Sequence, residues 1–374
     1  MSRIFYSVGG EGRGHATRAL AMIEDLRREH ELTVYASAQA YELIQSHYCE
    51  GGVAVRQIPG LCFHYSGSQK LNYPKTTWFG IRYVARLRSL VRRLEEDIEN
   101  DAPELAIVDY EPSLPRAALR CGLPFISLDH QHFLVTYDLS SLPARLKRHA
   151  AFMGKVVRSY YSGQKETVVS SFYFPPLKSD ARNTKQIGVI LRPEIIRATP
   201  ELRRHVVAYF RRSAPQGMLE ALNACGCEVR VYGLGVFPPS GHLRFLAVHP
   251  ERFVEDLATS RALITTAGNQ LVGEALYLRK PILASPEKGN YEQSINGHFL
   301  EMTGAGWSVE TDRFSGETVR SFMQNLDRFR YLGDIRRLYG NPAARATVLE
   351  YLPEKKPSYP RSPLGLPVKG WASA

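Results

Sequence analysis

The sequence lacks any apolar run close to the roughly 18 residues that a membrane-spanning helix needs. Its amino end lacks the basic and apolar segments of a secretory leader, because the strand-like residues 3–8 run directly into glycines. Cysteine is also scarce: the five residues are an odd number, and Cys225 and Cys227 have the wrong spacing for a CxxC redox or zinc pair. These absences predict a cytoplasmic protein whose thiols are reduced and mostly structural.

The positive charge is spread along the sequence and is not concentrated in one segment. The formal net charge is +11, yet the basic residues form no continuous block and accompany no DNA- or RNA-binding motif. Part of the excess lies in the proline-rich segment 351–374, which we expect to be a terminal tail. We therefore expect no nucleic acid as a partner, since a phosphate-bearing substrate or an anionic lipid surface explains the charge equally well.

Apolar strand-like runs alternate with helical patterns along the chain. In residues 1–178 the expected strands are 3–8, 31–37, 53–59, 104–110 and 124–130. In residues 179–350 they are 185–191, 205–210, 228–233, 243–248, 262–267, 281–286 and 306–310. Such alternation is typical of parallel sheets covered by helices, so we predict an α/β protein of two facing Rossmann-like domains with a cleft between them. Ligands bind such sheets at the carboxyl ends of the strands.

The first strand-to-helix turn reads GGEGRGH and is rich in glycine. Glycine allows positive φ and a close approach of the backbone to a ligand, and the following helix presents its amides to an anion or a polar oxygen. The glycines are Gly9, Gly10, Gly12 and Gly14. The turn is not a dinucleotide fingerprint, because His15 stands where the third glycine is required and the second strand ends in Ser37 rather than in an acid. A purely structural turn is the alternative.

A histidine and two carboxylates stand where a cleft is expected. His15 begins the first helix, whose positive end favours a neutral imidazole that can accept a proton from a hydroxyl. Asp109 ends an apolar strand, and Glu111 follows two residues later. Strand ends in α/β sheets bring carboxylates to a cleft, so Asp109 is a candidate partner for His15. The alternatives are a hydrogen bond from His15 to a loop carbonyl and a helix-capping role for Asp109.

The same pattern returns one strand later in LDHQHF, residues 128–133. Asp129, His130 and His132 are residue types that ligate metals, but the sequence has no companion cluster of ligands. We therefore expect a polar acceptor pocket here and no metal site.

The carboxyl-terminal half holds a second polar constellation. A strand ends at Thr265 and Thr266, and Gly268 and Asn269 open a helix whose terminal amides form an anion site. Glu274 lies in that helix, in an otherwise apolar stretch, where it can accept hydrogen bonds from two ribose hydroxyls. A solvent-facing helix acid is the alternative.

Further polar residues flank this constellation. Glu292 and Gln293 follow the next strand and offer hydrogen-bond acceptors and donors that suit sugar hydroxyls. Arg192, Arg211 and Arg212 follow strands as well. Each arginine either stabilises an anion in the cleft or lies on the solvated surface.

These motifs together resemble a glycosyltransferase of the GT-B fold. The matching features are GGEGRGH at the first turn, Asp109 at a strand end, and the later series TTAGN, GEAL, P and EQ. The similar groups are the lipid II N-acetylglucosaminyltransferases, the diacylglycerol glycosyltransferases and the nucleotide-sugar glucosyltransferases. The resemblance covers residues 1–350 in outline. It implies an acceptor domain at 1–178, a donor domain at 179–350, and transfer of a sugar from a nucleotide diphosphate donor, a UDP-sugar, to an acceptor hydroxyl with inversion and without a metal or other cofactor.

The resemblance also implies roles for single residues. His15 would be the catalytic base and Asp109 its orienting carboxylate. The implied donor-binding residues are Thr266, Gly268, Asn269, Glu274, Glu292, Gln293 and Arg211. The implied acceptor-binding residues are Gly12, Gly14, Glu111, His130 and His132.

The acceptor and the location of the protein are less specified. Residues 143–161 predict a basic amphipathic helix, which either lies on an anionic membrane or packs one face on the core. The expected acceptor is accordingly a lipid or a small molecule, and the expected location is the cytoplasm, at the inner face of the membrane if the helix binds lipid. The rival functions are a nucleotide-sugar epimerase of the same fold, a non-catalytic nucleotide-sugar or lipid-binding protein and, on charge alone, a nucleic-acid binder.

Overall fold

The computed structural model describes residues 1–374 apart from 11–12, 61–72, 212–213, 215–216 and 354–374. The amino-terminal half builds a seven-stranded sheet in the order β3-β2-β1-β4-β5-β6-β7, and every pairing in it is parallel. The strands are β1 (Arg3–Val8), β2 (Glu31–Ala36), β3 (Ala54–Gln57), β4 (Leu105–Asp109), β5 (Phe125–Asp129), β6 (Thr167–Ser170) and β7 (Thr184–Ile187). The central strands are apolar and buried, as expected for strands covered on both faces.

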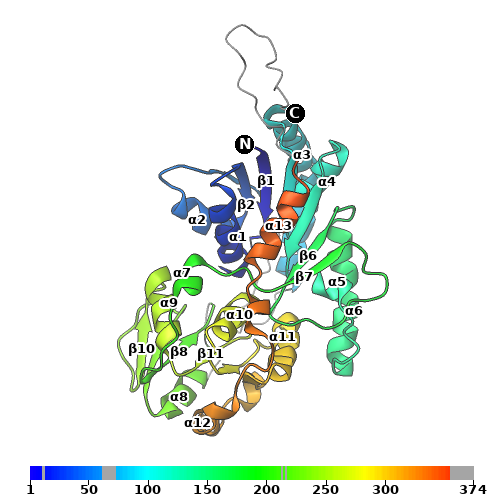
Figure 1. The fold of residues 1–374 in the computed structure, drawn as a ribbon. Coiled ribbons are helices and arrows are strands. Elements are labelled where there is room, and N and C mark those ends of the chain that lie inside the picture. The colour runs from blue at the N-terminus through cyan, green and yellow to red at the C-terminus, as the bar shows by residue number, and fades with distance from the viewer. Residues whose placement is uncertain (11–12, 61–72, 212–213, 215–216, 354–374) are drawn as a thin grey trace, which may run out of the picture.

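Helices cover this sheet on both faces (Figure 1). They are α1 (Arg13–Leu26), α2 (Ala38–His47), α3 (Tyr73–Asp101), α4 (Leu114–Arg120), α5 (Phe133–Thr136) and α6 (Ala144–Tyr160). Helix α3 begins well before residue 87, where the amphipathic pattern first becomes clear in the sequence.

The second half builds a six-stranded parallel sheet in the order β10-β9-β8-β11-β12-β13. Its strands are β8 (His205–Tyr209), β9 (Glu228–Tyr232), β10 (Leu243–Leu246), β11 (Leu263–Thr265), β12 (Ile282–Ala284) and β13 (Gly306–Ser308). The helices are α7 (Pro193–Arg197), α8 (Met218–Leu222), α9 (Pro250–Thr259), α10 (Asn269–Tyr277), α11 (Tyr291–Met302), α12 (Gly316–Gln324) and α13 (Asn341–Glu350). The predicted α/β architecture of two parallel-sheet domains is confirmed.

The course of the chain between the domains differs from the expected division at residue 178. Strand β7 was expected in the second domain, but it pairs with β6 at the edge of the first sheet. Helix α13 returns to the first domain (Figure 1), where Ala344 and Val348 join its core and Arg345 pairs with Asp25 and Glu29 of α1. Each half of the sequence therefore contributes to the amino-terminal domain. The expected tail, 351–374, lies outside the described residues from 354 onward.

One hydrophobic cluster contains residues of both domains. Tyr173, which follows β6, stacks on Phe299 of α11 with ring centroids 4.1 Å apart. The Tyr173 hydroxyl also donates to the Asn296 side-chain oxygen at 3.1 Å. This apolar contact holds the domains together behind the cleft.

Two simpler expectations concern membranes and thiols. Among the described residues, no helix has both the length and the apolar character needed to cross a membrane. The four described cysteines are free, and Cys62 lies outside the described residues.

Candidate active site

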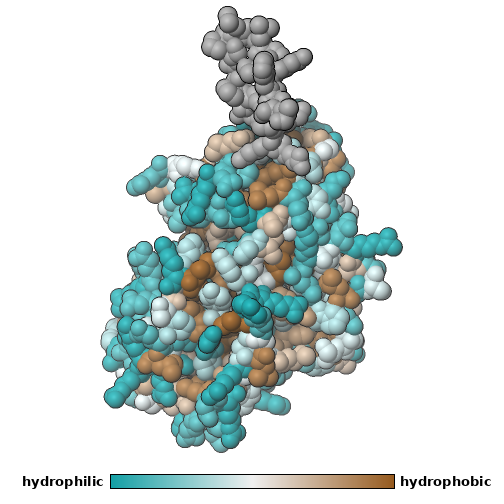
Figure 2. Space-filling view, viewed as in Figure 1, coloured by the Kyte–Doolittle hydropathy of each residue, from teal (hydrophilic) through white to brown (hydrophobic). Residues whose placement is uncertain are grey.

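A cavity of about 840 Å³ lies between the two domains. Its walls come from the carboxyl ends of strands in both sheets and from the first turns of α1 and α10. The surface is hollowed between the lobe that carries α2 and the lobe that carries α7 (Figure 2). Most of the predicted site residues line it: Gly14, His15, His130, Arg211, Thr266, Gly268, Asn269, Glu274, Glu292 and Gln293.

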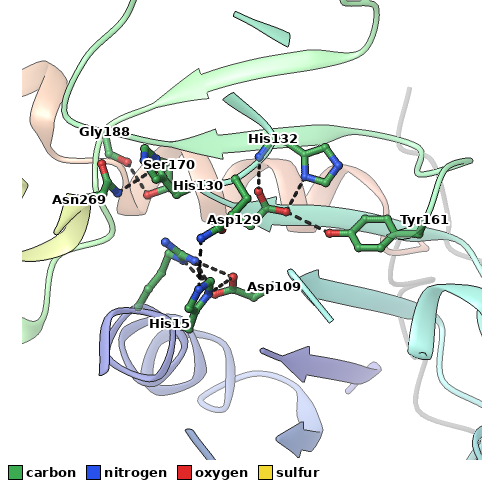
Figure 3. Close-up of polar contacts among 11 residues, drawn as sticks. His15, Asp109, Asp129, His130, His132, Tyr161, Ser170, Gly188 and Asn269 are labelled. Carbon is green, nitrogen blue, oxygen red and sulfur yellow. Dashed lines mark hydrogen bonds and ion pairs between the residues drawn. The ribbon is translucent and has the colours of Figure 1, made fainter. Parts of the chain in front are cut away.

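His15 and Asp109 form a pair at one side of this cavity (Figure 3). The His15 Nδ1 atom lies 2.8 Å from Oδ1 of Asp109. Asp109 is fully buried behind the imidazole, which presents its other edge to the cavity. There, the Nε2 atom lies 3.3 Å from the side-chain nitrogen of Gln131. The arrangement suits a base whose one nitrogen is oriented by a carboxylate while the other faces a substrate.

Two residues of this cluster were missed by the sequence analysis. Arg18 donates to both carboxylate oxygens of Asp109, over distances of 2.6 to 3.0 Å, and is itself 2% exposed. Its spacing of three residues from His15 on one helix was the available signal, because such residues share a helix face. Gln131 stands between two histidines that drew attention first.

The glycines of the first turn are required for different reasons. A Cβ atom at Gly10 would come within 2.4 Å of the Ser37 hydroxyl, so this position needs glycine for close packing of the first two strand ends. Gly14 lines the cavity, and Gly12 lies outside the described residues. The structural alternative thus accounts for Gly10 but not for Gly14.

Left-handed backbone follows one strand of each domain near the cavity. Tyr110, directly after β4, has φ of 51°, and Ala267, two residues after β11, has φ of 64°. Neither residue is glycine, and such conformations cluster at ligand-binding sites where the surrounding structure enforces them. Tyr110 also packs parallel to the His15 ring.

Two predicted acceptor residues point away from the cavity. His132 is buried with Asp129, at 2.7 Å, and Tyr161 donates to the same carboxylate (Figure 3). Burial alone would raise the pKa of Asp129, but the charge and hydrogen bonds of His132 hold it below its usual value. Glu111 accepts hydrogen bonds from the amides of Ser113 and Leu114 at the start of α4, and burial raises its pKa. Both side chains are buried and neither lines the cavity, so their acceptor-binding roles stay predictions.

His130 joins the two domains at the floor of the cavity. Its Nδ1 atom lies 3.2 Å from the Ser170 carbonyl oxygen, and its Nε2 atom lies 3.2 Å from the Asn296 side-chain oxygen. Asn269 donates to the same Ser170 oxygen at 3.1 Å from the other domain (Figure 3). Burial lowers the pKa of His130, which favours the neutral imidazole.

The first turn of α10 faces the amino-terminal domain. Gly268 is its N-cap, with no side-chain cap, and the side-chain oxygen of Asn269 is buried without a hydrogen-bond partner. Gln293 donates to the Thr266 hydroxyl at 3.4 Å, and its oxygen accepts from the backbone of Glu287. No ion pair or hydrogen bond joins the Glu292 carboxylate to another described side chain. The first-turn amides of α10 and the Asn269 side-chain oxygen are therefore available to bind a ligand in the cavity.

Glu274 is held by an arginine. The Arg192 guanidinium donates to both of its oxygens, at 3.0 and 2.6 Å, and Gln270 adds a third bond at 3.1 Å. The carboxylate is therefore buried and paired, unlike a solvent-facing helix acid. A carboxylate has about four lone-pair sites, so one remains for a ligand in this arrangement.

Positive charge gathers near Tyr209 at the end of β8. Burial raises the pKa of the Tyr209 hydroxyl. Three nearby positive charges oppose this effect and would lower the pKa, those of Arg13, Arg192 and Arg211. The Nε atom of Arg211 is buried without a partner among the described residues. Arg13 and Arg211 form no ion pair with a described carboxylate, which leaves both available to an anion in the cavity. Within the described part of the chain, no group of three or more His, Cys, Asp or Glu side chains is placed to hold a metal ion.

Two parallel-sheet domains that enclose a polar cavity at their strand ends define a GT-B glycosyltransferase fold. A family model described as Glycosyl transferase family 1 matches residues 2–327, and the chain belongs to this family. The protein is thus a glycosyltransferase. None of the curated proteins matches the chain in sequence.

Solved structures agree in fold at low sequence identity. The calicheamicin glycosyltransferase CalG4 is 18% identical, with 95% of this chain and 100% of that chain covered and a TM-score of 0.62. MurG from Acinetobacter baumannii is 14% identical, with coverages of 94% and 99% and a TM-score of 0.58. LpCGTa, solved in complex with UDP, is 16% identical, with coverages of 94% and 93% and a TM-score of 0.59. At these identities the similarity concerns the fold.

Proposed function

We propose that the protein transfers a sugar from a UDP-sugar to an acceptor hydroxyl, with inversion and without a bound metal. The observation that carries this proposal is the His15–Asp109 pair, which faces the cavity opposite the uncapped start of α10. One side of the cavity thus offers a base, and the other offers amides that suit a departing diphosphate.

The proposed reaction is a single displacement. His15 Nε2 takes the proton of the acceptor hydroxyl while that oxygen forms a bond to the anomeric carbon. The bond from that carbon to the diphosphate oxygen breaks, and its electron pair leaves with the diphosphate. Attack from the face opposite the leaving group inverts the anomeric centre. Asp109 holds the imidazole in the orientation that this transfer requires.

Positive groups in the cavity suit the leaving diphosphate. The amides of the α10 first turn and the side chain of Arg211 lie on the carboxyl-terminal wall, and Arg13 lies on the opposite wall. Preorganised donors of this kind stabilise charge that develops in the transition state. They carry the role that a metal ion has in metal-dependent sugar transfer, so we expect chelators to leave the activity unchanged.

The nucleotide assignment rests on Glu274 and on a fold relative. The Glu274 carboxylate lines the cavity and keeps a lone-pair site for a ribose hydroxyl. LpCGTa shares the fold and was solved with UDP. Glu292 and Gln293, at the start of α11, are placed for the hydroxyls of the sugar.

Helix α6 supports a lipid acceptor at an anionic membrane surface. Its exposed side carries Arg145, Lys147, Arg148, Lys155 and Arg158, together with Phe152, which is 64% exposed. Its other side is buried through Ala150, Gly154 and Val157. A basic face with an exposed aromatic ring can rest on anionic headgroups, so we propose peripheral binding at the cytoplasmic face of a membrane. On the face shown in Figure 2, the apolar residues form separate patches among hydrophilic ones.

The experiment is a donor screen with product analysis. The purified protein is incubated with UDP-sugars and candidate acceptors, with and without a chelator, and UDP release and the glycoside are both measured. Release of UDP with formation of a glycoside of inverted anomeric configuration supports the proposal. Conversion of the donor into its epimer without an acceptor would favour an epimerase, and binding of UDP without turnover would favour a non-catalytic protein.

A further inference from the structure

We propose that Arg18 is a positioning residue that acts through Asp109 to set the tautomer and the charge balance of His15. This inference rests on the proposed role of His15 as the base. It starts from the contacts of one side chain: Nε of Arg18 lies 3.0 Å from Oδ2 of Asp109, and Nη2 lies 2.6 Å from Oδ1 and 2.8 Å from Oδ2. The same Nη2 atom lies 3.1 Å from Nδ1 of His15.

The contacts select one tautomer of His15. An ionised carboxylate only accepts hydrogen bonds, and the His15 Nδ1 atom lies 2.8 Å from Oδ1 of Asp109. A bare Nδ1 would place two acceptors in repulsive contact at that distance, so Nδ1 carries the proton and donates a hydrogen bond to Asp109. The Arg18 Nη2 atom near Nδ1 is also a donor, but its two shorter contacts, to Oδ1 and Oδ2 of Asp109, account for its two hydrogens and leave none for Nδ1. Because the guanidinium occupies both carboxylate oxygens, Asp109 cannot rotate away. The bare Nε2 is thereby aimed at the cavity.

The charge of Arg18 also affects how a proton on His15 is balanced. Arg18 and Asp109 are both buried, with 3% and 0% of their side chains exposed, and their opposite charges offset each other. Asp109 therefore orients the imidazole more than it stabilises a positive charge on it. When His15 accepts a proton, the three side chains together gain one positive charge in a poorly solvated place. The negative charge that compensates it is the diphosphate of the donor, which sits across the cavity in the proposed reaction.

Because Arg18 and Asp109 offset each other, the positive charge of a protonated His15 is left to be balanced from across the cavity. In the proposed reaction, the proton that leaves the acceptor stays on His15 while the diphosphate, which balances its charge, departs from the sugar. Asp129 and His132 form a similar pair, but among the described residues no arginine forms an ion pair with Asp129, and neither residue lines this cavity.

The first test is a double-mutant cycle. Arg18→Lys keeps the charge but cannot donate to both carboxylate oxygens in the planar fork, so we expect kcat to fall roughly 10- to 100-fold with little change in the donor KM. In a protein that already carries His15→Ala, Arg18→Lys should have no further effect on kcat, because Arg18 acts through His15. An equal further loss in that background would overturn the inference. Arg230→Lys, which alters another arginine–aspartate pair in the second domain, is the matched control and should leave kcat unchanged.

The second test uses a variant that removes the charge. Arg18→Met frees both Asp109 oxygens and lets the carboxylate turn, so we expect kcat to fall further than in Arg18→Lys, with little change in the donor KM. A kcat equal to that of the unsubstituted protein contradicts the inference. Should this variant fold poorly, Arg18→Gln, which also removes the charge, is measured in its place with the same expectation.

The third test does not depend on activity. In protein with ¹⁵N-labelled histidine, long-range proton–nitrogen correlations assign the tautomer of His15, with His15→Gln identifying its signals. We expect a proton on Nδ1 in the free protein and a mixture of tautomers in Arg18→Lys. A proton on Nε2 in the unsubstituted protein would refute the positioning role even if the protein transfers sugar. A protein that shows the Nδ1 tautomer but no sugar transfer would refute only the proposed function.

Discussion

His15 and Asp109 are 94 residues apart in the chain, yet their side chains meet at 2.8 Å. The contact exists because β1 and β4 are neighbours in one parallel sheet, with Val8 opposite Asp109 in the register. The turn after β1 and the last residue of β4 therefore reach the same edge of the sheet, where the cavity opens.

Replacing His15 by alanine should remove the base while leaving the donor site intact. We expect turnover to fall by roughly 10²- to 10⁴-fold and the affinity for UDP to stay the same, measured by steady-state kinetics and calorimetry. His242→Ala, at an exposed position in the second domain, is the control and should behave like the unsubstituted protein. Unchanged turnover in His15→Ala would exclude the proposed role.

The two aspartate–histidine pairs should respond differently to the same substitution. Asp109→Asn should lower turnover by roughly 10²-fold, because the imidazole loses its orienting carboxylate. Asp129→Asn should instead lower the free energy of unfolding by about 2 kcal/mol, because it weakens charged hydrogen bonds to His132 and Tyr161. The low pKa of Asp129 in the folded protein contributes stability that is lost as pH falls through that pKa, so this variant should also show a shallower acid dependence of unfolding. Denaturant titrations between about pH 3 and pH 7 measure both effects; a steeper dependence in the variant would contradict the assignment.

His130 should make the protein less stable in mild acid. Burial lowers its pKa in the folded protein, whereas a histidine in the unfolded chain titrates near about 6.5. Below that pH the unfolded chain binds more protons, so the free energy of unfolding falls as the pH falls. His130→Gln cannot be protonated and should lose less stability between about pH 7.5 and pH 5.5. The measurement is denaturant unfolding at both values, with His242→Gln as control, and an equal loss in all three proteins would contradict the prediction.

Glu274→Gln should weaken nucleotide binding. The substitution removes a charged acceptor for a ribose hydroxyl and leaves Arg192 without its ion pair, so we expect the Kd for UDP to rise roughly 10- to 100-fold. Calorimetry with UDP and with 2′-deoxy-UDP checks the assignment, because the deoxy nucleotide should lose affinity for the unsubstituted protein only. Glu317→Gln in α12 is the control. Equal binding of both nucleotides to both proteins would place the ribose elsewhere.

The basic side of α6 should bind anionic lipid. Changing Arg148, Lys155 and Arg158 to serine should weaken binding to phosphatidylglycerol vesicles by about 3 kcal/mol, since each basic residue near such a surface contributes about 1 kcal/mol. The control changes Arg313, Arg320 and Arg328 to serine, which removes the same charge from exposed positions in the second domain. Vesicle sedimentation at low and high salt measures the difference. If both variants lose the same affinity, the interaction reflects net charge and not α6.

Much of the fold follows from the sequence because its signals are local. Apolar runs that alternate with helical patterns require parallel strands covered by helices, and parallel strands place their carboxyl ends at one edge. This geometry brings His15 and Asp109 to one cavity and puts Gly268 and Glu274 across from them. The resemblance to GT-B glycosyltransferases rests on the same strand-end motifs.

Other features depend on which neighbour a side chain meets. The edge strand β7 is mostly polar and only half-buried, so its sequence does not show which sheet it extends. Likewise, α13 returns to the first domain because Ala344 and Val348 find an apolar surface there.

The two aspartate–histidine pairs show the limit of local signals most clearly. In sequence, His132 after Asp129 is at least as suggestive as His15, yet it is buried with Tyr161 while His15 faces the cavity. The sequence by itself determined the two sheets and the edge at which chemistry can occur, because strand periodicity and strand-end residues are local properties. Only the tertiary structure decided that Arg18 holds Asp109 and that His15 is the histidine that faces the cavity, because ion pairing and access to the cavity depend on packing between segments far apart in the chain.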